Sequence, residues 1–114
     1  MTLSKQQILF TKNVGQLIDY IFSYGYQCTL GEAYRTPEQA AIYAQSGKGI
    51  LDSLHCKRLA IDINLFDANG NYLEDSSKYE VFGAYWERLD PLNRWGGKFP
   101  PPRIDGNHFE RKFV

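Results

Sequence analysis

Residues 59–66 (Leu-Ala-Ile-Asp-Ile-Asn-Leu-Phe) form the pattern that most constrains how this chain can fold. Apolar and other side chains alternate along the segment, which predicts a strand with one face in the core, because successive side chains of a strand point to opposite faces. Asp62 lies on the other face and is expected to point away from the core. The small side chain of Ala60 leaves room for an ion beside that carboxylate. The face expected to be buried carries Leu59, Ile61, Ile63 and Leu65.

Three segments have the pattern of helices. Apolar residues recur at helical spacing over residues 4–24, and Gly25 follows as the expected C-cap. A short helix is predicted over residues 36–45, where a proline stands in the first turn. A third is predicted over residues 75–90, with an aspartate or serine as its N-cap and an Asp-Pro pair at its end.

The other predicted elements are short. Residues 26–34 alternate well enough to predict a second strand, and residues 108–111 predict a last one. Asn69-Gly70 predicts a type I′ hairpin turn. The stretch before the last strand is expected to be irregular. Within it, Pro100-Pro101-Pro102 is expected to be an extended connector, because proline cannot donate a backbone hydrogen bond to a sheet.

The length and composition exclude several classes of protein. A chain of 114 residues predicts a single domain, residues 1–114. Lysine and arginine together equal aspartate and glutamate at 13 each, which argues against nucleic acid as the main partner. No apolar run approaches the roughly 20 residues of a membrane span. The N-terminus lacks the pattern of a secretory signal, so the protein is expected in the cytoplasm on synthesis. Cys28 and Cys56 are expected to be reduced thiols.

The chain has only two histidines, His55 and His108, and each lies a short distance from an aspartate. His55 precedes Asp62 by seven residues, and Asp105 precedes His108 by three. Two imidazoles and a carboxylate commonly hold a catalytic zinc with one coordination position left for water, whose pKa then falls to about 7. His55, Asp62 and His108 are therefore the predicted metal ligands, and zinc is the predicted cofactor.

Both spacings are odd, which limits how these groups can meet. In a regular strand Asp105 and His108 would point to opposite faces, so the intervening Gly106-Asn107 is expected to make a turn that brings them to one side. His55 is expected in the loop before the strand that carries Asp62. A structure in which either pair is splayed apart would remove the metal site.

Four further residues receive roles from their chemistry and position. Asp105 is predicted to act as general base and later as proton donor to the leaving amine. Arg35 is predicted to contact a substrate carboxylate or the developing oxyanion. Ser53 is expected to position the substrate or a ligand by hydrogen bonding. Cys56 is expected to be a packed neighbour of the site and not a fourth ligand, because a catalytic zinc keeps that position for water.

Each residue also has a simpler interpretation. A single histidine is more often a hydrogen-bonded structural side chain, and Asp62 alone is compatible with an ordinary strand residue that faces solvent. Arg35 alone suits a surface ion pair, Ser53 a loop or cap, and Asp105 a turn former in Asp-Gly. The spacing of these residues leaves a metal site and a purely structural role about equally supported.

Four sequence elements, spanning residues 33–110, resemble a known family. Residues 53–62 resemble the Ser-x-His-x(6)-Asp signature of the D-alanyl-D-alanine carboxypeptidase and L-alanyl-D-glutamate endopeptidase family of zinc peptidases. Residues 95–97 (Trp-Gly-Gly), 105–110 (Asp-Gly-Asn-His-Phe-Glu) and 33–39 (Ala-Tyr-Arg-Thr-Pro-Glu-Gln) resemble further elements of the same family, in the same order.

The resemblance implies an α+β fold, a small antiparallel sheet with helices packed on it, similar also to the metal-binding domain of hedgehog proteins. It implies zinc ligation by His55, Asp62 and His108, catalysis by Asp105 and Arg35, and substrate contacts from Arg35, Ser53 and Trp95. The expected substrate is a peptidoglycan stem peptide and the expected enzyme is a monomer without a separate wall-binding module. Many compact relatives are phage endolysins, which reach the wall when a holin opens the membrane.

Within this family the L-Ala-D-Glu endopeptidase is favoured over a D-Ala-D-Ala dipeptidase or carboxypeptidase, because position 105 is aspartate and the Trp-Gly-Gly element is present. A non-catalytic, metal-stabilised binding module is the alternative of a different class, and the presence of Asp105 argues against it. Two positions depart from the family pattern. Arg58 stands where glycine is usual and is expected to alter the loop or bind an acidic stem peptide. Asn107 stands where proline is usual and is expected to loosen the turn.

Overall fold

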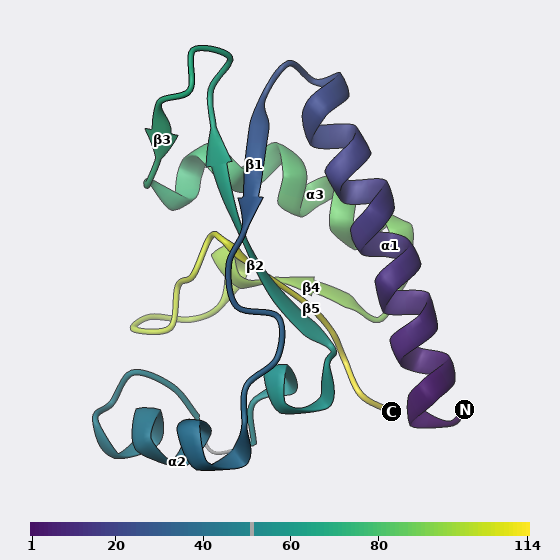
Figure 1. Ribbon diagram of the computed structural model, residues 1–114, viewed down its shortest axis with the longest axis vertical. Helices are drawn as coiled ribbons and strands as arrows, with labels where there is room; N and C mark the ends of the chain where they lie inside the picture. The colour runs from purple at the N-terminus through teal and green to yellow at the C-terminus, as the bar shows by residue number, and fades with distance from the viewer. Residues whose placement is uncertain (51) are drawn as a thin grey trace.

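A central antiparallel sheet organises the molecule, which is described by a computed structural model for residues 1–50 and 52–114 (Figure 1). The strand order is β1-β2-β5-β4, and the short β3 also pairs with β2. All four strand pairings are antiparallel. The strands are β1 Gln27–Leu30, β2 Ala60–Phe66, β3 Tyr72–Leu73, β4 Asn93–Trp95 and β5 His108–Arg111.

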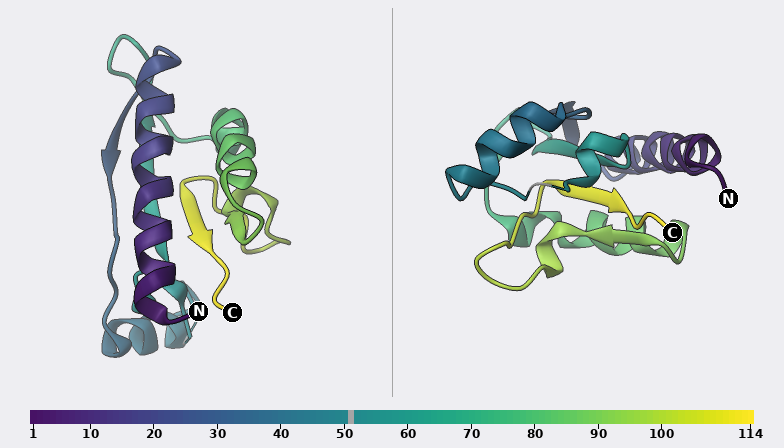
Figure 2. Two further views of the ribbon diagram at one scale, coloured as in Figure 1. Left: turned by 90° about the vertical axis from the view of Figure 1, so that its right-hand side faces the viewer. Right: turned by 90° about the horizontal axis from the view of Figure 1, so that it is seen from below.

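Helices α1 and α3 pack together and against the sheet, whereas α2 lies at the lower end of the molecule in Figure 1, the end at which α1 begins (Figures 1 and 2). Thr2 caps α1 by accepting a hydrogen bond from the Lys5 backbone N–H, and Thr36 caps α2 in the same way through Gln39. The α-helices are α1 Leu3–Ser23, α2 Pro37–Gln45 and α3 Glu80–Leu89; short 3₁₀ helices are η1 Leu54–Lys57, η2 Ser76–Tyr79 and η3 Gly96–Lys98. No described helix is both long and apolar enough to cross a membrane.

The core lies between the apolar face of β2 and the two large helices. Ile63 and Leu65 of β2 are fully buried, as are Leu17 of α1 and Trp86 of α3. The Phe10 ring meets the Trp86 ring edge to face at 5.6 Å between centroids. The predicted alternation of β2 is confirmed, since Asp62 and Asn64 on its other face remain partly accessible.

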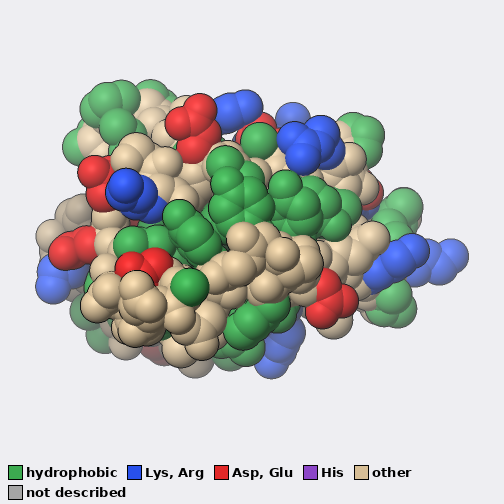
Figure 3. Space-filling model, turned by 90° about the horizontal axis from the view of Figure 1, so that it is seen from above, with side chains coloured by type: hydrophobic (Ala, Val, Ile, Leu, Met, Phe, Trp, Pro, Cys, Tyr) green, Lys and Arg blue, Asp and Glu red, His purple; other side chains and the backbone are tan. Residues whose placement is uncertain are grey.

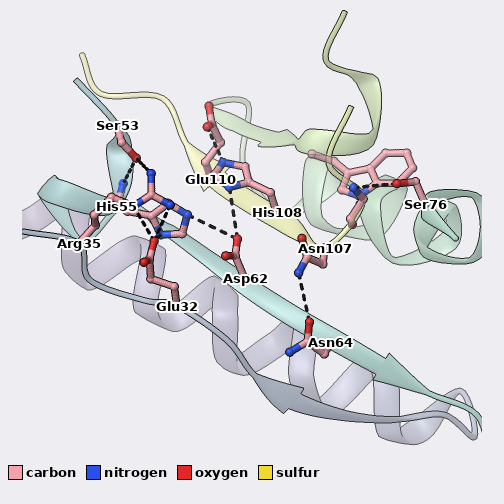
Figure 4. Close-up of polar contacts among 12 residues, drawn as sticks. Glu32, Arg35, Ser53, His55, Asp62, Asn64, Ser76, Asn107, His108 and Glu110 are labelled. Carbon is pink, nitrogen blue, oxygen red and sulfur yellow. Dashed lines mark hydrogen bonds and ion pairs between the residues drawn. The ribbon is translucent and has the colours of Figure 1, made fainter. Parts of the chain in front are cut away.

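The end of the molecule near the β2–β3 turn carries no exposed histidine. In the view from above, hydrophobic side chains gather across the middle of that face and charged side chains flank them (Figure 3). Both histidines are buried, and they lie with Asp62 on the side of the sheet near η1 (Figure 4). The two histidines and Asp62 therefore lie away from the end that carries the β2–β3 turn.

The α+β prediction, the three helices and the strands β2 and β5 are confirmed. The strand expected over residues 26–34 is shorter, because only residues 27–30 pair in register with β2. The sequence analysis missed β4, which lies in the stretch expected to be irregular. Both cysteines are free, as predicted.

Two predictions for connecting segments are wrong: the type I′ turn at Asn69-Gly70 and the extended connector at the proline run. A type I′ turn needs positive φ at both central residues, yet Gly70 has φ 83° while Asn69 is not among the described residues with positive φ. Asp67 instead pairs with Asn71 through its N–H, and its carbonyl accepts from Gly70, which makes a longer loop. The proline run is not an extended connector, because the Arg103 N–H bonds back to the Pro100 carbonyl and closes a turn.

Candidate metal centre and catalytic cleft

His55 is placed by the short helix η1 in front of β2. The Ser53 hydroxyl caps this helix by accepting a hydrogen bond from the His55 N–H at 3.2 Å. The helix ends at Arg58, whose left-handed backbone (φ 55°, ψ 38°) turns the chain into β2. His55 is only 2% exposed, so its ring is held in one place by the surrounding packing. It lies before the strand, as the odd spacing predicted.

Asp62 and His108 are brought together by the pairing of β2 with β5. The two residues stand directly opposite each other in the antiparallel register. Directly opposed side chains on neighbouring strands lie close enough to interact. The segment just beyond β1 also holds the Asp62 backbone. The Asp62 N–H donates to the Glu32 carbonyl, and the Asp62 carbonyl accepts from the Gly31 N–H.

Two of the three distances between the predicted ligand atoms are close to those around a tetrahedral zinc. Asp62 Oδ1 lies 3.4 Å from His55 Nε2 and 3.5 Å from His108 Nδ1 (Figure 4). All three ligand atoms lie within 4.8 Å of one another. A tetrahedral zinc with bonds of about 2.0–2.1 Å would separate its ligand atoms by roughly 3.3–3.4 Å. The residues therefore fit such an ion.

Unsatisfied polar atoms support the same conclusion. Asp62 Oδ1 and His55 Nδ1 are buried and have no hydrogen-bond partner among the described residues. A buried polar atom without a partner costs about 1–3 kcal/mol. For Asp62 Oδ1, which lies between the two imidazoles, a metal ion would remove that cost.

A carboxylate backs each histidine on the side away from Asp62. Glu110 Oε1 lies 2.8 Å from His108 Nε2, and Glu32 Oε1 faces His55 Nδ1 at 3.7 Å. Such carboxylates fix the tautomer of a ligating histidine and orient its ring. The arrangement directs His108 Nδ1 and His55 Nε2 toward the position between the ligands.

The charges within the cluster favour the ionised form of Asp62 and the protonated form of His108. Burial raises the pKa of Asp62, but the His108 and His55 rings outweigh this effect and lower it to about 2. Burial also disfavours a charged His108, yet Asp62 and Glu110 together raise the pKa of His108 to about 9. Burial raises the pKa of Glu110 as well. The neighbouring His108 and Arg94 outweigh this effect, so the pKa of Glu110 lies below its usual value.

Asp105 lies in the wall of the same cavity as the three ligands. Its N–H bonds to the Gly96 carbonyl at 3.0 Å, and its carbonyl accepts from the His108 N–H at 3.2 Å. A side chain on Gly96 would overlap the Asp105 carbonyl, so only glycine permits this close approach. Partial burial raises the pKa of Asp105 above its usual value. The turn at residues 106–107 brings Asp105 and His108 to one side, as predicted.

Arg35 and Ser53 also line the cavity. Arg35 Nε donates to Glu32 Oε1 at 2.7 Å, and its guanidinium lies 4.8 Å from the centre of the Tyr43 ring. Its Nη1 donates to the Ser53 hydroxyl at 3.3 Å. Because Ser53 is 5% exposed and already bonded to η1, its position suits orienting Arg35 and His55.

Trp95 lies elsewhere, which corrects the expected substrate contact. Its side chain is 6% exposed, packs in the core, and donates from Nε1 to the Gly106 carbonyl at 2.7 Å. It does not line the cavity that contains the ligands. Trp95 therefore supports the turn that carries Asp105 from behind, and Gly83 and Gly97 leave the space that its indole fills.

At the two positions that depart from the family pattern, contacts of the side chain accompany the local backbone conformation. Arg58 adopts the left-handed conformation that favours glycine, and its guanidinium stacks on the Tyr34 ring at 4.1 Å. Asn107 does not loosen the turn, because its side chain donates to Asn64 at 3.1 Å and its carbonyl accepts from Ile63.

The sequence analysis missed the supporting roles of Glu32 and Glu110. Glu110 could have been found, since it lies two residues after His108 on the same face of a strand. Glu32 gave no such signal, because its approach to His55 depends on how the chain leaves β1. Cys56 lies outside the group of described residues that could hold a metal, as predicted.

Comparisons with known proteins agree with this geometry. The family model described as D-alanyl-D-alanine carboxypeptidase matches residues 46–111, more than half of the chain. No curated protein sequence matches this chain.

Two solved structures share the fold. The Serratia marcescens L-Ala D-Glu endopeptidase ChiX is 21% identical with a TM-score of 0.69, over 85% of this chain and 76% of that one. A mutant of the vancomycin resistance D,D-pentapeptidase VanY, from a VanB-type cassette and in complex with Zn(II), is 17% identical with a TM-score of 0.60, over 92% and 71%. The chain therefore belongs to the D-alanyl-D-alanine carboxypeptidase family and is a zinc-dependent peptidase that acts on peptidoglycan.

Proposed function

We propose that the protein is an endopeptidase that hydrolyses the L-alanyl-D-glutamate bond of peptidoglycan stem peptides. The observation that carries the proposal is the cluster of His55, Asp62 and His108, whose ligand atoms lie within 4.8 Å of one another in one cavity with Asp105. Three protein ligands leave a coordination position open, which a structural zinc site does not. Asp105 and the Trp-Gly-Gly element favour the endopeptidase over other members of the family.

The three ligands would hold zinc through His55 Nε2, Asp62 Oδ1 and His108 Nδ1. Bound zinc would supply Lewis acidity, which lowers the pKa of a water and polarises the scissile carbonyl. Glu110 would keep the His108 ring in the tautomer that this ligation needs, and the negative charge of Glu32 faces His55 Nδ1 at 3.7 Å. The deep burial of both rings limits their movement during the reaction.

Asp105 would take the proton from the attacking water and deliver it to the leaving amine. The partial burial that raises the pKa of Asp105 makes its protonated form a better populated intermediate in this transfer. The hydrogen bond from its own N–H to the Gly96 carbonyl fixes the Asp105 backbone in the wall of the cavity that contains the ligands, which supports this role.

Arg35 would bind the oxygen on which negative charge develops, or a carboxylate of the substrate. The guanidinium already has a fixed orientation, because Glu32, Ser53 and the Tyr43 ring contact it from different sides. Ser53 is proposed as a positioning residue, since its hydroxyl contacts Arg35 and the His55 backbone.

Several further properties belong to this proposal. The protein acts as a monomer, and residues 1–114 form one catalytic domain. Its route to the wall is of the phage endolysin type, from the cytoplasm after release by another factor such as a holin.

A second candidate reaction is removal of a C-terminal D-alanine. It is favoured by the description of the matching family and by the place of Arg35, whose guanidinium in the cavity suits a terminal carboxylate. The two reactions release different products, so one experiment separates them.

The test is mass spectrometry of purified peptidoglycan digested by the zinc-loaded protein, with Asp105→Ala as the control. Cleavage between L-Ala and D-Glu is expected to release stem peptides that begin with D-glutamate, and the control is expected to release none. Release of D-alanine alone would establish the carboxypeptidase instead. Equal digestion by Asp105→Ala would remove Asp105 from its role.

The ligand assignment has its own test. His108→Ala is expected to lose both bound zinc and hydrolysis, because it removes one of only three protein ligands. Metal content is measured by elemental mass spectrometry after dialysis, with Asp105→Ala as the matched variant that should retain zinc. Equal zinc in both variants would contradict the assignment.

A further inference from the structure

The cavity around the metal ligands is rich in cations although the chain as a whole has no net charge. The cavity has a volume of about 740 Å³, within the usual range for ligand sites. Its lining includes four carboxylates, Asp52, Asp62, Asp105 and Glu110. It also includes six lysine and arginine side chains, Arg35, Lys48, Lys57, Arg94, Arg103 and Lys112.

Two of the six cations already have a carboxylate partner. Arg35 pairs with Glu32, and Arg94 pairs with Glu110. The other four form no ion pair with any described residue. One of these, Lys57, lies over the Phe113 ring at 4.8 Å. The cavity therefore keeps positive charge that the protein itself does not neutralise.

Lys48 and Arg103 come from two segments that are distant in the sequence and contribute to the lining of the same cavity. Lys48 lies in the turn after α2, and Arg103 lies in the loop after η3, two residues before Asp105. Both residues line the cavity that contains the metal ligands. Both side chains are exposed, so a bound peptide can reach them.

We propose that Lys48 and Arg103 form an anion-recognising subsite that binds a free carboxylate of the peptide beyond the two residues joined by the cleaved bond. The proposal rests on the proposed function and adds a substrate preference to it. The enzyme prefers stem peptides whose third residue carries a free carboxylate, such as diaminopimelate, over peptides in which that group is a carboxamide.

The chemistry of the two side chains supports this choice of ligand. An arginine guanidinium binds a carboxylate through two parallel hydrogen bonds, and a lysine ammonium adds a mobile point charge. A carboxamide has a similar shape but no charge, so it loses most of this interaction. Both cations are exposed, so the preference is modest and is weakened by salt.

The experiment compares two peptides that differ only in one group. Two forms of N-acetyl-L-Ala-γ-D-Glu-diaminopimelate are digested by the zinc-loaded enzyme, both with the C-terminal carboxyl group blocked as an amide, one with a free side-chain carboxylate and one with a side-chain carboxamide. The value of kcat/KM is measured for each. A preference of about 3- to 10-fold for the carboxylate is expected at low ionic strength. The double variant Lys48→Gln/Arg103→Gln is expected to bring the ratio close to one.

Lys12→Gln is the matched control, because Lys12 is exposed on α1, carries the same charge and does not line the cavity. It is expected to keep the full preference. Equal ratios in the wild type and the double variant would overturn the subsite while leaving the peptidase proposal intact.

Binding of the same two peptides, measured by calorimetry, separates the two proposals. If neither peptide is cleaved, the L-Ala-D-Glu proposal fails. The subsite is still supported when the carboxylate peptide binds more tightly and the double variant abolishes that difference. Equal binding of both peptides overturns it.

Discussion

Arg58 occupies a position whose backbone would suit glycine better. Its φ of 55° is the only positive φ of a described non-glycine residue. A left-handed conformation costs an L-residue with a Cβ roughly 1–2 kcal/mol relative to the right-handed one. The stack of its guanidinium on Tyr34 offsets part of this cost, by about 0.5–1 kcal/mol for an exposed pair.

The first prediction compares two substitutions at this position. Arg58→Ala keeps the left-handed strain and loses the contact with Tyr34, whereas Arg58→Gly relieves the strain. The glycine variant is therefore expected to be more stable than the alanine variant by about 1 kcal/mol. Urea denaturation of both variants measures the difference. A less stable glycine variant would show that strain does not matter here.

The second prediction concerns Glu110, which binds His108 Nε2 from behind. Glu110→Gln keeps the shape but removes the charge that fixes the ring, so zinc affinity is expected to fall about 10-fold. Competition with a chromogenic chelator measures the affinity, and circular dichroism checks the fold. Glu80→Gln, at the exposed start of α3, is the control. Unchanged affinity in Glu110→Gln would remove the supporting role.

Sequence spacing named the candidate ligands but supported a metal site and a structural role about equally, and the family resemblance decided between them. The odd separations of His55 from Asp62 and of Asp105 from His108 required an interruption before each strand, and η1 and the turn at 106–107 supply it. Glu32 was out of reach because its carboxylate meets His55 only after the chain beyond β1 pairs with Asp62.

At the level of elements, β4 is held against α3 by an unusual contact. The Trp95 indole occupies the space where a side chain of Gly83 would stand, so helix and strand approach closely. The sequence did not show β4, because this strand has only three residues, which are too few to display alternation. It lies between an Asp-Pro pair and two glycines. By contrast β2 is seven residues long and its alternation predicted its buried face correctly.

The third prediction follows from this contact. Replacing glycine by alanine inside a helix ordinarily stabilises it, and Gly15→Ala in α1, where nothing lies within 4 Å, is expected to gain about 0.5–1 kcal/mol. Gly83→Ala in α3 is expected to lose about 1–3 kcal/mol, because the new Cβ would overlap Trp95. Thermal or urea denaturation of both variants gives the two signs. Stabilisation by Gly83→Ala would contradict the packing described for β4.

At the level of the whole molecule, the metal site joins parts that are distant in sequence. His55 belongs to η1, Asp62 to β2 and His108 to β5. The strand pairing that aligns Asp62 with His108 therefore also closes the cavity. The sequence predicted which residues would meet, with Asp62 and His108 on strands and His55 just before one. It did not predict the cationic lining, which assembles from the turn after α2, the loop after η3 and the residues after β5.

The last prediction is that removing zinc destabilises the entire fold, because the ligands come from three elements. A ligand that binds only the folded state at 100 times its dissociation constant stabilises it by about 2.7 kcal/mol. For a domain of this size that corresponds to a Tm roughly 10–15 °C higher with zinc than after chelation. Calorimetry with zinc or with EDTA measures the shift. His108→Ala, which lacks one ligand, is expected to show little response to zinc, and an equal response would mean that the ion stabilises the protein from another site.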